Sequence, residues 1–155
     1  MTSVTRLPAA VVDTSAIFCI FEQEASGPAF LDALERCDRL FLSAGTLAEL
    51  SILMIARAGP DGASALDDFL ANFAIEVVPV DATSVRDHFR DGFIRYGKGT
   101  GHPARLNYGD LFAYALAADL NLPLLFQGGD FSRTDIVNAM AALGFTLGAK
   151  GETSP

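Results

Sequence analysis

The chain has 155 residues, of which 50% are hydrophobic and 19% are charged; this composition excludes a disordered segment and fits one domain with a buried core. It carries 11 Lys and Arg against 19 Asp and Glu, and the net charge of −8 excludes nucleic-acid binding that relies on an overall positive charge. Any contact with a phosphate backbone must therefore be local or mediated by a metal ion.

Membrane, secreted and disulfide-rich classes are also disfavoured. The longest apolar run, residues 111–118, is much shorter than the roughly 20 residues that a bilayer span requires. The first eight residues carry one Arg and no apolar core typical of a secretory signal, so we expect a cytoplasmic location. Only Cys19 and Cys37 are present, too few for a disulfide framework or a structural zinc site, and we interpret both as core residues.

Apolar strands and amphipathic helices alternate along the chain. Strands are predicted at residues 9–12, 40–42, 75–80, 123–126 and 145–147. Helices are predicted after Asp13, after Gly27-Pro28, from Thr46 to Gly59, around 66–73, from Asp81 to Tyr96, from Asp110 to Asp119 and from Thr134 to Leu143. Each strand is apolar on both faces, as in a sheet with helices on both sides. The predicted fold class is therefore α/β, a three-layer sandwich around a mainly parallel sheet of four or five strands.

The domain organisation is simple, because no internal repeat or linker divides the chain. We interpret residues 1–8 as an N-terminal extension, residues 9–147 as a single domain and residues 148–155 as a flexible tail.

Four acids are predicted near the carboxyl ends of the strands, where functional sites of parallel sheets lie: Asp13, Glu49, Asp110 and Asp130. If the first strand is central, with the second and fourth beside it, all four meet in one crevice. They would repel one another unless a cation neutralised them. Ligands that are all oxygen suit Mg²⁺ or Mn²⁺ rather than Zn²⁺. The hypothesis is a Mg²⁺ site that binds a phosphodiester and orients a water for in-line attack.

Each of these acids also has a purely structural interpretation. The three aspartates precede predicted helices, where Asp is a favoured N-cap. Glu49 serves equally as a capping-box partner of Thr46. Thr14 and Ser15 are either turn residues or supports for the carboxylate of Asp13 and a metal-bound water. The structural interpretations explain each acid singly but give no reason for all four to meet.

Five of the eleven basic residues lie in the segment that leads to Asp110. They are Arg86, Arg90, Arg95, Lys98 and Arg105. Some are expected to pair with Asp87 and Asp91 on a solvated helix surface. The others are candidates for a local basic rim that holds a phosphate backbone beside the metal.

Several short motifs occur in a characteristic order. They are VVDTSA (11–16), YGKG (96–99), HPA (102–104), LNYGD (106–110) followed by FAYALA (112–117), and LLFQGGDF (124–131). Together they resemble the PIN-domain ribonucleases, specifically the VapC toxins of bacterial type II toxin–antitoxin systems. The likeness extends from about residue 11 to residue 146, nearly the whole chain.

This resemblance implies a PIN-like fold and a Mg²⁺-dependent endoribonuclease that hydrolyses RNA, inhibits translation and is neutralised by a cognate VapB-type antitoxin. Carried over residue by residue, Asp13 and Asp110 match the principal metal ligands. Glu49 matches the acid on the helix after the second strand, and Asp130 matches the fourth acidic position. The resemblance makes the basic residues named above candidate RNA contacts.

The chain departs from the family pattern beside the fourth acid. Relatives often place an acid or Asn just before it, where this chain has Gly129, and Gln127 stands where a Lys is common. An alternative is therefore a catalytically degenerate PIN-like domain that only binds protein or RNA. A phosphoacceptor receiver domain fits less well, because it needs paired acids after the first strand, where this chain has Asp13-Thr14.

The resemblance further implies a homodimer and an antitoxin whose tail crosses the acidic site. Such a tail would bring an Arg, because a guanidinium can take the place of a metal ion among carboxylates.

Overall fold

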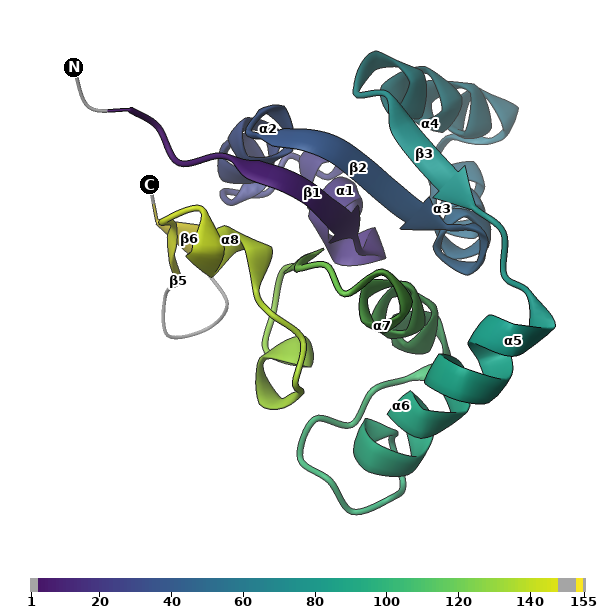
Figure 1. Cartoon of the computed structure of the whole chain (residues 1–155). Coiled ribbons are helices and arrows are strands. Elements are labelled where there is room, and N and C mark those ends of the chain that lie inside the picture. Colours follow the sequence, from purple (N-terminus) through teal and green to yellow (C-terminus); the bar gives the residue numbers. More distant parts are fainter. Residues whose placement is uncertain (1–2, 148–152, 155) are drawn as a thin grey trace.

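A parallel sheet of four strands organises the computed structural model, which describes residues 3–147 and 153–154 (Figure 1). The strands are β1 (Leu7–Val12), β2 (Cys37–Ser43), β3 (Ile75–Val78) and β4 (Leu124–Leu125), in the order β3-β2-β1-β4. All three neighbouring pairs are parallel, with Val11 opposite Phe41 on one side and opposite Leu124 on the other. The first strand thus lies between the second and the fourth, which is the condition under which the acids were expected to meet.

Helices cover both faces of the sheet. They are α1 (Thr14–Phe21), α2 (Gly27–Glu35), α3 (Ala44–Ala58), α4 (Pro60–Asn72), α5 (Ala82–Ser84), the π-helical turn η1 (Val85–Phe89), α6 (Arg90–Tyr96), α7 (Tyr108–Leu120), the 3₁₀ turn η2 (Phe131–Arg133) and α8 (Ala139–Ala142). Figure 1 shows α1 to α4 gathered on one side of the sheet, and α7 on the other side with α5 and α6 outside it. The predicted three-layer arrangement is thus present.

Alternate strand residues enter two separate cores. Ala10 and Val12 of β1 pack with the residues of α1 to α4, whereas Val11 packs with α7. In β2, Leu40 and Leu42 join the first core and Phe41 packs against the second. Burial on both faces explains why these strands are continuously apolar in the sequence.

The structure corrects three predicted helix and strand boundaries. Helix α3 begins at Ala44 with Ser43 as its N-cap, so Thr46 lies inside the helix and does not open it. The helix predicted over residues 134–143 is reduced to α8, because Asn138 caps a later start by accepting from the amide of Ala141. The strand predicted at 145–147 does not join the main sheet, since β5 (Thr146–Leu147) pairs antiparallel with β6 (Thr153–Ser154).

Of the two predicted ends of the domain, the structure can be compared only with the N-terminal one. Strand β1 begins at Leu7, inside the predicted extension 1–8. The predicted flexible tail, residues 148–155, lies outside the described residues except for Thr153 and Ser154.

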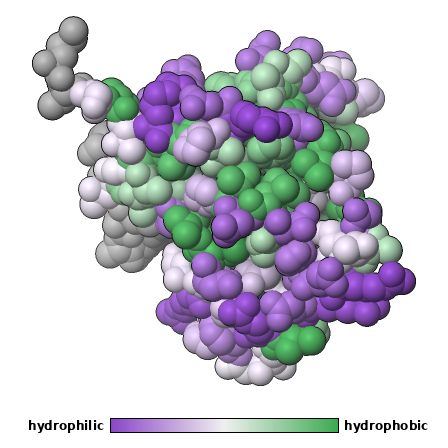
Figure 2. Space-filling model, in the orientation of Figure 1, coloured by the Kyte–Doolittle hydropathy of each residue, from purple (hydrophilic) through white to green (hydrophobic). Residues whose placement is uncertain are grey.

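Across the part of the chain that the structure describes, no helix is both long enough and apolar enough to cross a membrane. The face shown in Figure 2 carries hydrophilic groups around its periphery and apolar groups between them.

We predict that Gly62→Ala destabilises the fold. Gly62 is buried where α4 crosses α3, and an added Cβ would collide with the carbonyl oxygen of Met54. The backbone must then shift, which costs about 1–3 kcal/mol and exceeds the roughly 1 kcal/mol that Ala gains over Gly in a helix. Denaturant unfolding measures this loss. Gly129→Ala is the control, because open space surrounds that position, and an equal effect of the two changes would contradict the packing argument.

Candidate active site

Asp13 follows β1 directly and is held by the first turn of α1. It is the N-cap of this helix, and its Oδ2 accepts hydrogen bonds from the Ser15 amide at 3.0 Å and from Ser15 Oγ at 2.6 Å. The Ser15 hydroxyl in turn accepts from the amide of Gln127 at 2.9 Å, just beyond β4. Asp13 is 4% exposed. The hydrogen bonds at the ends of β1 and β4 therefore fix Oδ2 of Asp13 and leave its Oδ1 available to a ligand.

Asp110 is held in a similar way at the start of α7. The N-cap of this helix is Asn107, so the prediction that Asp110 opens the helix was wrong. Asp110 is the capping-box partner: its Oδ2 accepts from the Asn107 amide at 3.0 Å, while its own amide donates to Asn107 Oδ1 at 2.9 Å. As in Asp13, one oxygen is used by the backbone and the other is available.

The side chain of Glu49, on α3, extends to the first turn of α7, where Asp110 lies. Its carboxylate lies against Gly109, where any Cβ would collide with Glu49 Oε2. Only a glycine beside Asp110 therefore lets α3 bring an acid to the first turn of α7. One turn earlier, Gly45 gives the same close approach to the ring of Phe112.

Burial and mutual repulsion perturb the acids. Burial raises the pKa of Asp13 to about 6; the two hydrogen bonds from Ser15 oppose the rise, and the charge of Glu49 adds to it. Burial raises the pKa of Asp110 to about 7, the bond from the Asn107 amide opposes it, and the charges of Asp13, Asp130 and Glu49 add to it. The four predicted acids thus act on one another electrostatically.

Asp130 is the most loosely held of the four. It is exposed at the start of η2, and its side chain makes no capping hydrogen bond to that turn. The uncharged side chain of Gln127 stands where relatives often have Lys. Its Oε1 accepts from Ser26 Oγ, and its Nε2 donates to the Glu24 carboxylate oxygen Oε2 at 2.6 Å. Sequence reasoning missed this network because it joins segments about a hundred positions apart.

The donor chemistry at this crevice fits a hard divalent cation. Among residues 3–147 and 153–154, no three acidic, His or Cys side chains are drawn together closely enough to enclose an ion. Asp13 and Asp110 nevertheless each offer one available carboxylate oxygen, and a bound cation would offset the burial and the neighbouring negative charges that raise their pKa values. The buried hydroxyls of Thr14 and Thr46 also lack hydrogen-bond partners within the described structure.

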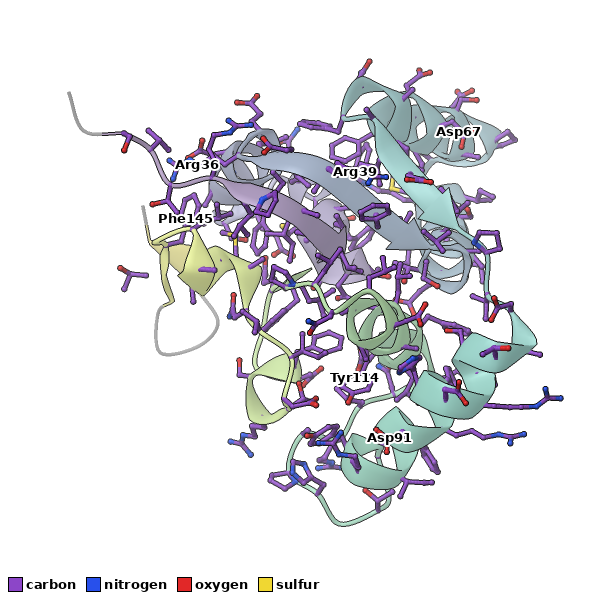
Figure 3. The ribbon with its side chains drawn as sticks, viewed as in Figure 1. Arg36, Arg39, Asp67, Asp91, Tyr114 and Phe145 are labelled. Carbon is purple, nitrogen blue, oxygen red and sulfur yellow. The ribbon has the colours of Figure 1, made fainter. Side chains whose placement is uncertain are left out.

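The five basic candidates are all exposed but differ in their contacts. Arg95 forms ion pairs with Asp91 at 3.2 Å and with Asp135 at 3.3 Å, and its guanidinium also lies over the ring of Tyr96. Figure 3 shows Tyr114 between α7 and α6, near Asp91; its hydroxyl donates to Asp135 at 2.9 Å.

The other four make no ion pair with any residue that the structure describes; they are Arg86, Arg90, Lys98 and Arg105. Lys98 lines a groove with Asn107 and Tyr108, and Asn107 shares the capping box of α7 with Asp110. The sequence prediction that Asp87 pairs with this cluster is not met among these contacts, and Asp91 pairs only with Arg95. Among the four, Lys98 is the one that lines a groove together with the N-cap residue of α7.

Comparisons with known proteins agree with this geometry. The model of the PIN domain family matches residues 10–137. Ribonuclease VapC42 of Mycobacterium tuberculosis is 43% identical over 129 residues, covering 81% of this chain and 95% of the relative. Ribonuclease VapC28 of the same organism is 38% identical over 130 residues, covering 84% of this chain and 97% of the relative.

Solved structures show the same fold. Mycobacterium tuberculosis VapC20, a Sarcin-Ricin loop cleaving toxin, superposes with a TM-score of 0.67 at 18% identity, covering 83% of this chain and 96% of that one. VapBC-5 from the same organism, a member of the VapBC family of toxin–antitoxin systems, gives a TM-score of 0.55 at 28% identity, covering 85% and 94%. The chain therefore belongs to the PIN-domain family and, within it, to the VapC ribonucleases.

Proposed function

We propose that this protein is a metal-dependent endoribonuclease toxin that hydrolyses RNA phosphodiester bonds and thereby inhibits translation. The observation that carries the proposal is a pair of carboxylates, buried Asp13 and partly buried Asp110, each with one oxygen fixed by the backbone and one available. The names of its relatives as ribonucleases support the same activity.

The proposed mechanism assigns a role to each acid. Asp13 and Asp110 would hold Mg²⁺, with Mn²⁺ as a substitute, and Glu49 on α3 and Asp130 at the start of η2 would complete the ligand set. The ion, when bound, neutralises the acids and polarises the phosphodiester. Ser15 keeps the Asp13 carboxylate in place, and Asn107 does so for Asp110.

RNA is held beside these acids by side chains of the segment before Asp110. Lys98 is placed to contact a phosphate near the crevice, because it lines the groove that includes Asn107. Arg86, Arg90 and Arg105 are exposed and available for more distant phosphates. Arg95 instead holds α6 to the segment after η2.

We predict that Asp13→Asn and Asp110→Asn each abolish Mg²⁺-dependent RNA cleavage. Each change removes a charged ligand, so the loss should exceed the roughly 100-fold that removal of a supporting residue costs in metal sites. Cleavage of structured RNAs by purified protein, with and without EDTA, measures it. Asp119→Asn on the same helix is the control, since that acid pairs with His88. Cleavage that persists in EDTA, or in either site variant, would overturn the mechanism.

We also predict an unusual pH dependence of the metal-free protein. Because the folded-state pKa values of Asp13 and Asp110, about 6 and about 7, exceed the ordinary value of 3.8, the folded state binds more protons than the unfolded state between these limits. The two carboxyl groups therefore favour the folded state at low pH, where they are protonated, and this stabilisation is lost as pH rises through 7.

Thermal unfolding at pH 5.5 and pH 8 measures this contribution. At pH 8, Asp110→Asn should raise the melting temperature of the metal-free protein by about 2–4 °C, because it removes the repelled charge. Added Mg²⁺ should stabilise the wild type more at pH 8 than at pH 5.5. Equal stabilisation at both pH values would show that the ion does not bind these carboxylates.

The proposed homodimer has a candidate surface next to the site. Ile52 on α3 and Tyr108 on α7 are 70% and 73% exposed and line one apolar groove of about 230 Å³. Tyr108 and the 46%-exposed Phe93 line a second groove of about 430 Å³. Exposed apolar patches of this kind mark surfaces for association. We therefore place the dimer contact at the Ile52 groove, on α3 and the start of α7, and assign the second groove, which Lys98 also lines, to RNA.

The proposed antitoxin is of the VapB type, as in the solved VapBC complexes from Rickettsia felis and Salmonella typhimurium, which show the same fold. Its tail would cross the crevice and bring an Arg to Asp13 and Asp110. A guanidinium there relieves the same repulsion as the metal ion does. The metal ion and the antitoxin Arg should therefore compete for the same site between Asp13 and Asp110.

We predict that Ile52→Glu converts the dimer to a monomer, because it places a charge in the apolar contact without disturbing a buried side chain. Light scattering coupled to size-exclusion chromatography measures the mass. Val137→Glu is the control, since Val137 is also exposed, at 60%, but lies outside both grooves. A monomeric wild type, or a dimeric Ile52→Glu protein, would refute the proposed surface.

A further inference from the structure

The second groove, which we call the aromatic groove, lies at the start of α7. The rings of Phe89, Phe93 and Tyr108 line it, together with the buried side chains of Leu106 and Leu111. Its volume of about 430 Å³ falls within the roughly 300–1,000 Å³ of sites that bind small molecules. The groove therefore has room for a flat organic group.

Two of these rings are exposed, although both are held in place. Tyr108 is 73% exposed and Phe93 is 46% exposed. The Tyr108 ring makes edge contacts with Phe89 at 6.0 Å and with Phe112 at 4.9 Å between ring centres. The Phe93 ring lies against Gly97, where an added Cβ would collide with it. A ligand that stacks on the two rings therefore orders little that is not already ordered.

Lys98 supplies positive charge to the aromatic groove. Its amide donates to the Leu106 carbonyl at 2.8 Å, and the Leu106 amide donates to the Tyr96 carbonyl at 2.8 Å. These two bonds hold the backbone of Lys98 beside the residue that precedes Asn107. The Lys98 side chain is exposed and makes no ion pair with any residue that the structure describes, so its ammonium group is available to an anion.

The aromatic groove and the acidic crevice meet at the first turn of α7. Asn107 lines the groove and forms the capping box of this helix with Asp110. Because the Asn107 Oδ1 accepts from the Asp110 amide at 2.9 Å, its Nδ2 is the group that it can offer to a ligand. A chain that crosses the crevice can therefore continue into the groove.

We propose that the aromatic groove binds an unpaired nucleobase of the RNA, stacked on Tyr108 and Phe93, while Lys98 contacts a neighbouring phosphate. This inference rests on the proposed function and extends it from phosphate binding to recognition of a base. A nucleotide joins a flat face that stacks on aromatic rings to an anionic phosphate, and the groove offers a partner for each. A purely apolar peptide would leave Lys98 without a counter-charge. A paired base cannot enter, because the duplex covers both its faces, so the groove selects single-stranded RNA.

The test separates the base from the phosphate with two probes of equal charge. One is a short single-stranded RNA, and the other is a baseless sugar–phosphate chain of the same length. Both are measured with Asp13→Asn protein in Mg²⁺, because this variant is expected to leave the RNA intact and does not alter the capping box of Asp110. Fluorescence anisotropy of the labelled probes gives each Kd. The RNA should bind at least about 5-fold more tightly than the baseless chain, the lower limit for stacking of one base.

Substitutions added to this protein assign the two contacts. Phe93→Leu keeps an apolar side chain against Gly97 and removes the ring, so it should weaken RNA binding about 5-fold and leave the baseless chain unaffected. Lys98→Gln should weaken both probes equally, because it removes a phosphate contact. Ile94→Ala is the control for Phe93→Leu, since Ile94 is 71% exposed on the same helix and lies outside the groove. Arg39→Gln removes the same charge from β2 and is the control for Lys98→Gln; neither control should change either Kd.

Several outcomes would overturn the inference. They are RNA that binds no more tightly than the baseless chain, RNA binding that Phe93→Leu leaves unchanged, and equal weakening of both probes by Phe93→Leu. Phe93→Glu in the wild type tests whether the groove is instead a contact between two copies of the chain. Its mass in solution should equal that of the wild type, and a monomeric Phe93→Glu protein from a dimeric wild type would also overturn the inference. A wild type that cleaves no RNA defeats the proposed function instead, and the comparison of the two probes still decides the role of the groove.

Discussion

The carboxylates of Asp13 and Asp110 repel each other in a partly dehydrated crevice, and much of the local structure serves to hold them there. Burial and neighbouring acids raise both pKa values, so the arrangement is unfavourable for the charged, metal-free protein. It persists because each carboxylate is fixed by hydrogen bonds at the start of a helix. The order of the strands then determines that these two helix starts face one another.

Capping and metal binding are therefore not competing explanations for these acids. The N-cap bond of Asp13 and the capping box of Asp110 occupy one oxygen each and orient the other. Stabilisation of the helices and orientation of the ligands follow from the same hydrogen bonds. Glu49 differs, because Gly109 makes room for its carboxylate and no helix cap involves it. Its place depends on the packing of α3 against α7.

The sequence predicts the sheet well, because strands buried on both faces leave continuous apolar runs. It also predicts the edge of the sheet at which the acids lie, since Asp13 directly follows β1 and Asp130 comes in the loop after the neighbouring strand β4. That all four acids serve as one ligand set stays a prediction. Helix starts were less predictable: Ser43 and Thr46 are equally good caps by residue type, and only the end of β2 selects Ser43. The contact of Glu49 with Gly109 and the pairing of Arg95 with Asp135 depend on tertiary packing, which no local pattern encodes.

The net charge of −8 is distributed so that several of the acids repel one another at a single crevice. The central claim is that a divalent cation binds there, between Asp13 and Asp110. The most direct measurement is anomalous scattering from crystals grown with Mn²⁺. The account predicts an anomalous peak within about 2.5 Å of an oxygen of each aspartate. A peak elsewhere, or none at this crevice in crystals that bind Mn²⁺ at other positions, would contradict it.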